Sequence, residues 1–384
     1  MRLLRESLIA ASLALSVLAL ACGGGAAPTP SQAGTGEERF LPRPTSVFRA
    51  APELAGLSPW INSEPVTIQQ LLSERRVVLI DFWTYTCVNC IRTLPYLKVW
   101  DERYRDHGLT IIGVHSPEFE FEKITANVRM AVKDFGIQYA VAQDNQFSTW
   151  RAFKNAYWPA KYLIDSGGGI RYQHFGEGEY LATERQIRLA LQEAGRDVSG
   201  IPEGGYELPA TDPRAITVTR ELYGGYDRNY GPFGSYAGQE LYYKAPDQTH
   251  LYEDNERHAH NKWYLSGLWR NEAQAIVHAR QTEDWEDYIA VRVAGRSGNV
   301  VISPAMPVAF DVVVEIDGRP LQQDEAGADI VFDDQGRSIL KVEEARLYRF
   351  LELPEFGIRE IKLRSNSDAF AVYAFTFGVY QDGA

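Results

Sequence analysis

Two cysteines, Cys87 and Cys90, lie directly between a predicted buried strand and a predicted amphipathic helix. The apolar run Val77–Trp83 precedes the pair, and the segment Ile91–Leu97 follows it. A strand, a tight loop with two thiols and a helix form the setting in which a Cys-x-x-Cys pair carries out redox chemistry. The helix N-terminus favours a thiolate at the first cysteine. The same spacing would supply half of a zinc site, but the sequence has no second pair to complete one.

Length and charge limit the classes of protein to consider. The chain has 384 residues, more than one average domain needs, so two folded domains are expected. Hydrophobic residues make up 45% of the sequence and charged residues 23%, which is enough apolar material for a sizeable core. The formal charge is −12 with no basic block, and this argues against nucleic-acid binding because phosphates require a positive patch.

The N-terminus has the form of an export signal. A basic start, Met1–Arg5, precedes the apolar run Leu8–Ala21, which is short for a spanning helix and ends in small residues before Cys22. The segment resembles a bacterial lipoprotein signal, although Ala19 stands where leucine is more usual. The resemblance implies a signal peptide over residues 1–21 and lipidation at Cys22, which would also account for the odd cysteine. A plain secretory signal with an incidental cysteine is the alternative.

Alternating strand and helix patterns predict an α/β domain over residues 47–198. A Gly-, Ala-, Pro- and Thr-rich tether over residues 22–46 precedes it. The alternation is typical of a central sheet covered by helices. The strands are predicted at Val77–Trp83, Leu109–Val114, Tyr139–Ala142, Tyr162–Asp165 and Ile170–Phe175, and the helices at Cys90–Tyr104, Phe119–Phe135, Thr149–Phe153 and Thr183–Ala194.

A Gly- and Pro-rich linker is predicted over residues 199–213, with a second domain over residues 214–384. Short β-branched and aromatic runs between turn signals predict a β-sandwich there. Its strands are predicted at Ala275–Ala279, Tyr288–Val293, Val300–Ser303, Ala309–Ile316, Ile339–Val342, Arg359–Leu363 and Ala371–Phe377.

The first part of this second domain is rich in aromatic and histidine residues. The aromatic residues either form a surface for a sugar or a protein, or fill the sandwich core. They are Tyr223, Tyr226, Tyr230, Tyr236, Tyr242, Tyr243, Tyr252, Trp263, Trp269 and Trp285. A metal site would need ligands such as His250, His258 and His260 with Glu253 and Asp254, but a polar loop with several histidines is more often only a loop. No metal is therefore expected.

Further residues near the cysteines suit redox chemistry. Asp81 lies inside the apolar strand, where burial should raise the pKa of its carboxyl group. Such a group can exchange a proton with the second cysteine, or else it caps a neighbouring loop. Trp83 and Tyr85 are placed to cover the dithiol loop. The Trp158–Pro159 bond precedes a strand and is a candidate for the cis form, with a trans proline as the alternative.

These residues together resemble a known family. The segment Val78–Trp83 with Cys87, Cys90 and Pro95 resembles the thioredoxin pattern, and Pro159 matches the cis-proline that faces the dithiol in that fold. The chain also resembles the exported TlpA-like branch and the extracytoplasmic part of DipZ proteins, in which a thioredoxin-like domain precedes a β-sandwich similar to galactose- and carbohydrate-binding modules. The segments that support this are Leu54–Leu57, Trp60–Asn62, Phe82–Cys90, His115–Phe119, Asn261–Trp269, Asp317–Arg319, Arg346–Tyr348 and Tyr373–Gly378.

The resemblance implies a thiol-disulfide oxidoreductase with no bound cofactor, whose redox-active disulfide joins Cys87 and Cys90. Cys87 would attack the substrate disulfide, and Cys90 would resolve the mixed disulfide with Asp81 as base. The residues expected to contact the substrate are Trp83, Tyr85, Trp158 and Pro159. Strongly oxidising relatives have a histidine between the cysteines, and Val88-Asn89 offers no such charge, so reduction of protein disulfides is favoured.

The resemblance also indicates partners and location. DipZ proteins have their own transmembrane electron-transfer domain, whereas this chain has a predicted lipid anchor in its place. A separate membrane electron donor of the DsbD/CcdA type is therefore expected, together with a location in the periplasm or at the cell surface. The β-sandwich would bind a glycan or a protein.

Two rival hypotheses remain. A thiol peroxidase would have the pattern Pro-x-x-x-Thr-x-x-Cys; Thr84 fits, but Ile80 stands where the proline should be. A non-enzymatic surface lipoprotein built on a thioredoxin scaffold is the other hypothesis. The presence of both cysteines, Asp81 and Pro159 argues against a lost activity.

Overall fold

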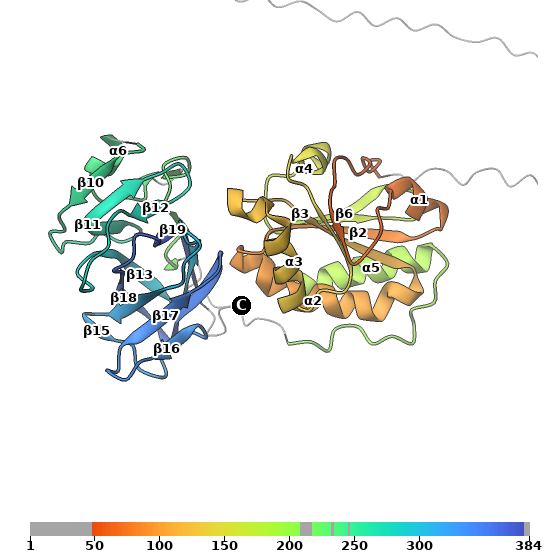
Figure 1. Cartoon of the computed structure of the whole chain (residues 1–384). Helices are drawn as coiled ribbons and strands as arrows, with labels where there is room; N and C mark the ends of the chain where they lie inside the picture. The colour runs from red at the N-terminus through yellow and green to blue at the C-terminus, as the bar shows by residue number, and fades with distance from the viewer. Residues whose placement is uncertain (1–47, 208–216, 232–233, 245, 380–384) are drawn as a thin grey trace, which may run out of the picture. The chain divides into compact units, whose positions relative to one another are not determined.

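The computed structural model describes residues 48–207, 217–231, 234–244 and 246–379 (Figure 1). The predicted signal peptide, Cys22, the tether and the last part of the predicted linker lie outside these ranges. The described residues belong to one compact unit. Within them, no helix combines the length and the apolar character that crossing a membrane requires.

The first domain is built on a six-stranded sheet with the order β1-β4-β3-β2-β5-β6 (Figure 1). Strand β2 is parallel to β3, which is parallel to β4, whereas β5 runs antiparallel to β2. The strands are β1 (Trp60–Ile61), β2 (Val77–Trp83), β3 (Leu109–His115), β4 (Ala140–Gln143), β5 (Ala160–Ile164) and β6 (Ile170–Phe175). The α/β prediction for this region is confirmed.

Helices pack on both faces of this sheet. Alternate side chains of β2 point to opposite faces, so every residue of this strand is buried. Leu79 of β2 belongs to the apolar cluster with α2, α3 and α5, and Ile80 to the cluster with α1 and α4. The helices are α1 (Ile68–Ser73), α2 (Val88–Tyr104), η1 (Arg105–His107), η2 (Glu120–Lys123), α3 (Thr125–Asp134), α4 (Ser148–Phe153) and α5 (Tyr180–Glu193). The predicted helix Phe119–Phe135 is wrong as one element, since Ile124 is extended between η2 and α3.

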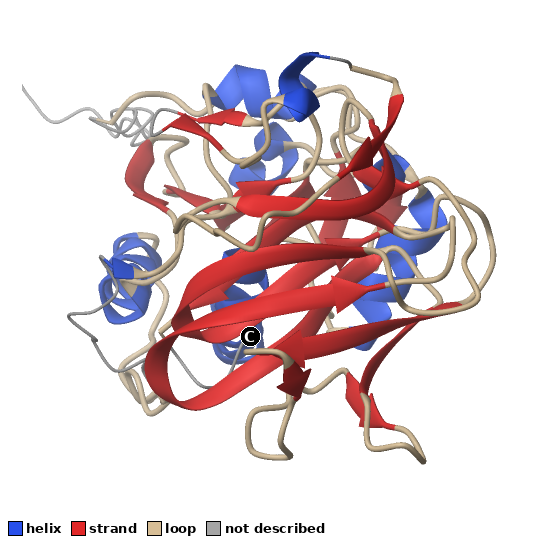
Figure 2. Cartoon of the chain, turned by 90° about the vertical axis from the view of Figure 1, so that its left-hand side faces the viewer, coloured by secondary structure: helices blue, strands red, loops and turns tan. Residues whose placement is uncertain are grey.

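The second domain is all-β, as predicted, apart from the single turn α6 (Leu241–Lys244). Its main sheet has the order β10-β11-β12-β19-β13-β18-β14-β17-β16, and Figure 2 shows its strongly curved strands. The strands are β7 (Leu222–Tyr223), β8 (Tyr230–Gly231), β9 (Gly234–Ser235), β10 (Thr249–Tyr252), β11 (Trp263–Asn271), β12 (Ile276–His278), β13 (Tyr288–Ile302), β14 (Phe310–Ile316), β15 (Arg319–Pro320), β16 (Ile330–Phe332), β17 (Ser338–Val342), β18 (Arg346–Arg364) and β19 (Ala371–Gly378).

Two long strands make this sheet fold over into a sandwich. Strand β13 pairs with β18 along its length, but with β11 near its start and with β19 near its end. The predicted strands Tyr288–Val293 and Val300–Ser303 are therefore not separate; they are the two ends of β13, which continues through register shifts near Gly295 and Gly298.

The aromatic residues of this domain mainly fill its core. Tyr236, Tyr242, Tyr252, Trp263 and Trp269 are all buried in the sandwich cluster. The core interpretation is therefore correct for these five residues, and they are not available to a sugar. Strand β11, which contains the two tryptophans, is not among the strands predicted from the sequence pattern.

The two domains share an apolar cluster. Val301, Leu347 and Ala374 of the second domain belong to the cluster that contains Val88 and Cys90 of the first. Rings also meet there, since those of Phe119 and Tyr373 lie edge to face with centroids 5.2 Å apart. The sheet face with Val301 and Ala374 therefore lies against the domain that contains the dithiol.

Candidate active site

The two thiols differ in burial. Cys87 is the N-cap of α2 and is half-buried, whereas Cys90 is buried, and both are free thiols. The backbone N–H of Cys90 donates to Cys87 Sγ at 3.3 Å, which places this sulfur at the positive end of a 17-residue helix. Burial, and then the neighbouring Cys87, raises the pKa of Cys90 well above its ordinary value. One thiol is therefore placed to attack and the other to resolve.

Asp81 lies in β2, six residues before Cys87, and is 1% exposed. Burial raises the pKa of its carboxyl group to about 7, and the charge of Lys161 partly opposes this rise. Asp81 also contributes to the raised pKa of Cys90. A carboxyl group with this pKa can take up and return a proton near neutral pH.

Lys161 is a site residue that sequence analysis missed. It is directly opposite Asp81 in the β2–β5 register and is fully buried, and this burial lowers its pKa. Neither Lys161 Nζ nor Asp81 Oδ1 has a hydrogen-bond partner among the described residues. The available signal was a lysine inside the apolar run Ala160–Ile164, two residues after Pro159.

The predicted substrate contacts have different outcomes. The Trp158–Pro159 peptide is cis, as predicted, and the Trp158 indole N–H donates to the Ser116 carbonyl at 2.9 Å. Trp83 is 0% exposed and packs edge to face on His115, so the prediction that it contacts substrate is wrong. A strand buried on both faces leaves its last residue no access to solvent.

A buried glutamate ties the loop after β3 to the dithiol loop. Glu122 is completely buried and accepts hydrogen bonds from the Thr86 hydroxyl at 2.5 Å, the Phe119 N–H at 3.0 Å and the Glu118 N–H. Burial, and then the charge of Glu118, raises the pKa of Glu122 to about 7. Because Thr86 immediately precedes Cys87, this carboxyl group fixes the approach of the chain to the reactive cysteine.

Replacing Thr86 by valine is expected to destabilise the protein by about 1–3 kcal/mol, because Glu122 loses a donor in a buried setting. Denaturant unfolding monitored by tryptophan fluorescence measures this change. Thr110→Val is a suitable control, since that hydroxyl is only part-buried and bonds to Arg76. An equal loss in both variants would contradict the special role of Thr86.

Cys87 opens into a cleft of about 370 Å³ that both domains line. The first domain contributes Asn89, Glu118 and Trp158, and the second contributes Arg220 and Thr376 among others. Interactions across the cleft join the two sides: Glu118 accepts from the Tyr223 hydroxyl at 2.8 Å and pairs with Arg228. The sequence contained no signal that the second domain would line the site, because these residues come together only in the folded unit.

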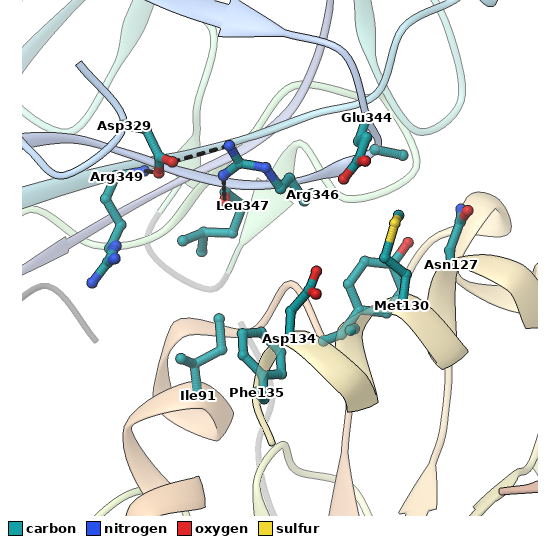
Figure 3. Close-up of a pocket in the computed structure, with 13 residues that line it drawn as sticks. Ile91, Asn127, Met130, Asp134, Phe135, Asp329, Glu344, Arg346, Leu347 and Arg349 are labelled. Carbon is teal, nitrogen blue, oxygen red and sulfur yellow. Dashed lines mark hydrogen bonds and ion pairs between the residues drawn. The ribbon is translucent and has the colours of Figure 1, made fainter. Parts of the chain in front are cut away.

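A second pocket, of about 490 Å³, lies beside the dithiol loop. Figure 3 shows it between Met130 and Asp134 of α3 on one side and Glu344 and Arg346 on the other. Tyr85, predicted to contact substrate, lines this pocket, whereas Cys87 does not. Cys87 therefore opens into the other cleft and not into this pocket.

Two histidines of the second domain, His258 and His260, lie within hydrogen-bond distance of other side chains of the chain. His258 is buried, with its ring nitrogens 2.8 Å from Glu360 and 2.9 Å from Asp254, and His260 lies 3.1 Å from the Thr219 hydroxyl. Within the described ranges, no group of three or more His, Cys, Asp or Glu residues is arranged to bind a metal ion.

This geometry agrees with the comparisons with known proteins. Residues 51–187 match the Redoxin family, and residues 219–378 match the family described as thioredoxin-like C-terminal domain. The thiol-disulfide oxidoreductase YkuV of Bacillus subtilis is 30% identical over 142 residues, which are 37% of this chain and 94% of YkuV. The chain belongs to the thioredoxin-like thiol-disulfide oxidoreductases.

Another relative of this oxidoreductase matches both domains. Protein DipZ of Mycobacterium bovis is 38% identical over 275 residues, which are 70% of this chain and 37% of DipZ. The chain thus spans little more than a third of the length of DipZ. A solved structure of a thioredoxin-like protein in the oxidised form covers 38% of this chain and 97% of its own, with 28% identity and a TM-score of 0.35.

Proposed function

We propose that this oxidoreductase is lipid-anchored through Cys22 outside the cytoplasm and reduces disulfides of substrate proteins with Cys87 and Cys90. The observation that supports this most is the position of Cys87, whose sulfur caps α2 beside a cleft while Cys90 is buried behind it. The uncharged pair between the cysteines supports the reducing direction. The predicted export signal, which lies outside the described residues, supports the proposed location.

The reaction proceeds in two exchanges. The Cys87 thiolate attacks one sulfur of the substrate disulfide, that bond breaks, and the first substrate thiolate leaves. Cys90 then transfers its proton to Asp81 and attacks Cys87 Sγ, which expels the second substrate thiolate and forms the Cys87–Cys90 disulfide. Two electrons pass from the dithiol to the substrate. A separate membrane protein of the DsbD/CcdA type returns two electrons to the enzyme for the next cycle.

Replacing Cys90 by serine is expected to trap the mixed disulfide, because the attacking thiol remains and the resolving one is absent. The variant would be expressed in cells, and disulfide-linked complexes would be separated without reductant and identified by mass spectrometry. The double variant Cys87→Ser, Cys90→Ser is the matched control and should form none. Equal amounts of complexes in both variants would contradict the proposal.

The second domain has its own proposed partner, a glycan or a protein. The aromatic side chains that are only half-buried, such as Tyr226 and Trp285, are the groups available for it.

A further inference from the structure

Several polar atoms of the second domain are enclosed beside the cleft without a hydrogen-bond partner. They are the Thr376 hydroxyl, both amide atoms of Asn299, and Nε and Nη1 of Arg220, as far as the described residues show. Thr376 is 7% exposed and Asn299 is 0% exposed. Leaving such groups unpaired costs about 1–3 kcal/mol each. A cluster of them at one place indicates that a polar group from outside the chain belongs there.

The strand register places this cluster on the sheet face that lies against the dithiol domain. Asn299 of β13 is directly opposite Thr376 of β19, and Val301 is opposite Ala374 two residues along. Side chains two residues apart on a strand share a face. Because Val301 and Ala374 pack in the same cluster as Cys90, Asn299 and Thr376 lie on this face too. Thr376 lines the cleft into which Cys87 opens.

Arg220 brings a positive charge to the same cleft. Its Nη2 donates to the Ser235 carbonyl at 3.2 Å, and its guanidinium group stacks 4.5 Å from the centre of the Tyr236 ring. This contact fixes the plane of the group and leaves Nε and Nη1 as donors. Both bidentate forks of a guanidinium group include Nη2, which already donates here to Ser235, so Nε or Nη1 can give an incoming carboxylate one charge-assisted hydrogen bond.

The other charges of the cleft have partners in the structure. Glu118 is paired with Arg228, and the single proton of the Tyr223 hydroxyl lies between Glu118 at 2.8 Å and Glu221 at 2.9 Å. Arg228 also stacks near the rings of Tyr223 and Trp158. Among the charged groups described in this cleft, the Arg220 guanidinium therefore has the donors that an incoming anion can use.

We propose that Arg220 and Thr376 bind a carboxylate that lies close to the disulfide of the substrate, with Asn299 behind them. The enzyme is thereby selective for carboxylate-bearing disulfides, whether the carboxylate belongs to a small thiol compound or to an acidic residue beside a protein cysteine. This inference rests on the proposed exchange at Cys87. The donor atoms are enclosed in this structure, so the proposal requires the side chains around Arg220 to move aside when the carboxylate enters.

The test measures how fast the reduced chain is oxidised by three small disulfides of different charge. These are dithiodipropionate, which is anionic, bis(2-hydroxyethyl) disulfide, which is neutral, and cystamine, which is cationic. Each rate is divided by the rate of dithiothreitol with the same disulfide, because leaving groups differ in reactivity. The formal charge of −12 would by itself favour cystamine. We expect the normalised rate to be about tenfold higher for dithiodipropionate than for cystamine.

Two variants assign this preference to the cleft. Arg220→Met should abolish it, and Thr376→Val should reduce it about threefold to tenfold, since it removes one hydrogen-bond donor to the carboxylate with little change in shape. Arg292→Met is the matched control, because Arg292 is exposed on β13 and its loss changes the net charge equally. If Arg220→Met does not fold, Thr376→Val decides. A preference that neither variant changes overturns the proposal. The proposal is also overturned if the unmodified chain reacts with dithiodipropionate and cystamine at about equal normalised rates.

Two further measurements identify the source of the carboxylate and test separately whether Cys87 exchanges with disulfides at all. Peptide disulfides with glutamate or glutamine beside the cysteine replace the small compounds; preference for the glutamate peptide indicates an acidic protein segment, and its absence indicates a small thiol compound. A chain that reacts with no disulfide, including the neutral one, overturns the proposed exchange itself. A chain that reacts equally with all three retains the exchange and overturns only the selectivity.

Discussion

Replacing Asp81 by asparagine is expected to slow resolution of the mixed disulfide by about a hundredfold to ten-thousandfold, the usual contribution of a general base. Cys90 is buried and its pKa is raised, so few molecules have the thiolate unless a nearby group takes the proton. Asp81 is the carboxyl group that acts on Cys90 electrostatically and titrates near neutral pH. Attack by the half-buried Cys87 should change much less.

The pH dependence provides a specific signature of this role. In the unmodified chain, the resolution rate should rise as pH increases through about 7, where Asp81 becomes the charged base. Asp81→Asn should remove this inflection. Stopped-flow tryptophan fluorescence from pH 5 to 9 separates the two steps, with the exposed Asp134→Asn as the control. An unchanged inflection in Asp81→Asn would show that another group supplies the base.

The same substitution should also change stability. The folded-state pKa of Asp81 lies above its ordinary value of 3.8, so its favourable contribution is complete below about pH 4 and is lost as pH rises through about 7. The difference between the two pKa values corresponds to roughly 4 kcal/mol. Asp81→Asn should therefore gain stability relative to the unmodified chain between pH 4 and 7, as urea unfolding at several pH values would measure.

Replacing Lys161 by methionine is expected to move the inflection of the resolution rate to higher pH. The charge of Lys161 lowers the pKa of Asp81, and without it the carboxyl group titrates above about 7. The variant should also unfold at higher denaturant concentration near pH 6, by the equivalent of about 1–4 kcal/mol, because a buried amino group without a hydrogen bond is removed.

The sign of this stability change follows from the lowered pKa of Lys161. A lysine whose folded-state pKa is below 10.5 destabilises the fold while it is charged, and this cost decreases as pH rises towards 10.5. The gain in Lys161→Met should therefore be largest at low pH. Lys133→Met, at an exposed position on α3, is the control. An unshifted inflection in Lys161→Met would mean that Lys161 does not act on Asp81.

Local patterns predicted much of the first domain. The strand Val77–Trp83 has the predicted ends, and α2 begins within two residues of its predicted start, because apolar periodicity and a helix cap depend on neighbours in the chain. The interruption at Ile124 and the single long strand β13 were missed, since continuous hydrogen bonding across a sheet depends on partners far away in sequence.

The pair Cys87 and Cys90 is a feature whose structure and chemistry the sequence alone predicts. Its own neighbours determine a dithiol at the start of a helix, and with Asp81 and Pro159 they determine the family and its chemistry. Tertiary structure alone decided which groups surround this dithiol: Lys161 through the register of β5, Glu122 through the loop after β3, and Arg220 with Thr376 through the packing of the second domain. The physical reason is that burial and charge act through space, and separation along the chain does not reveal which side chains will share a cleft.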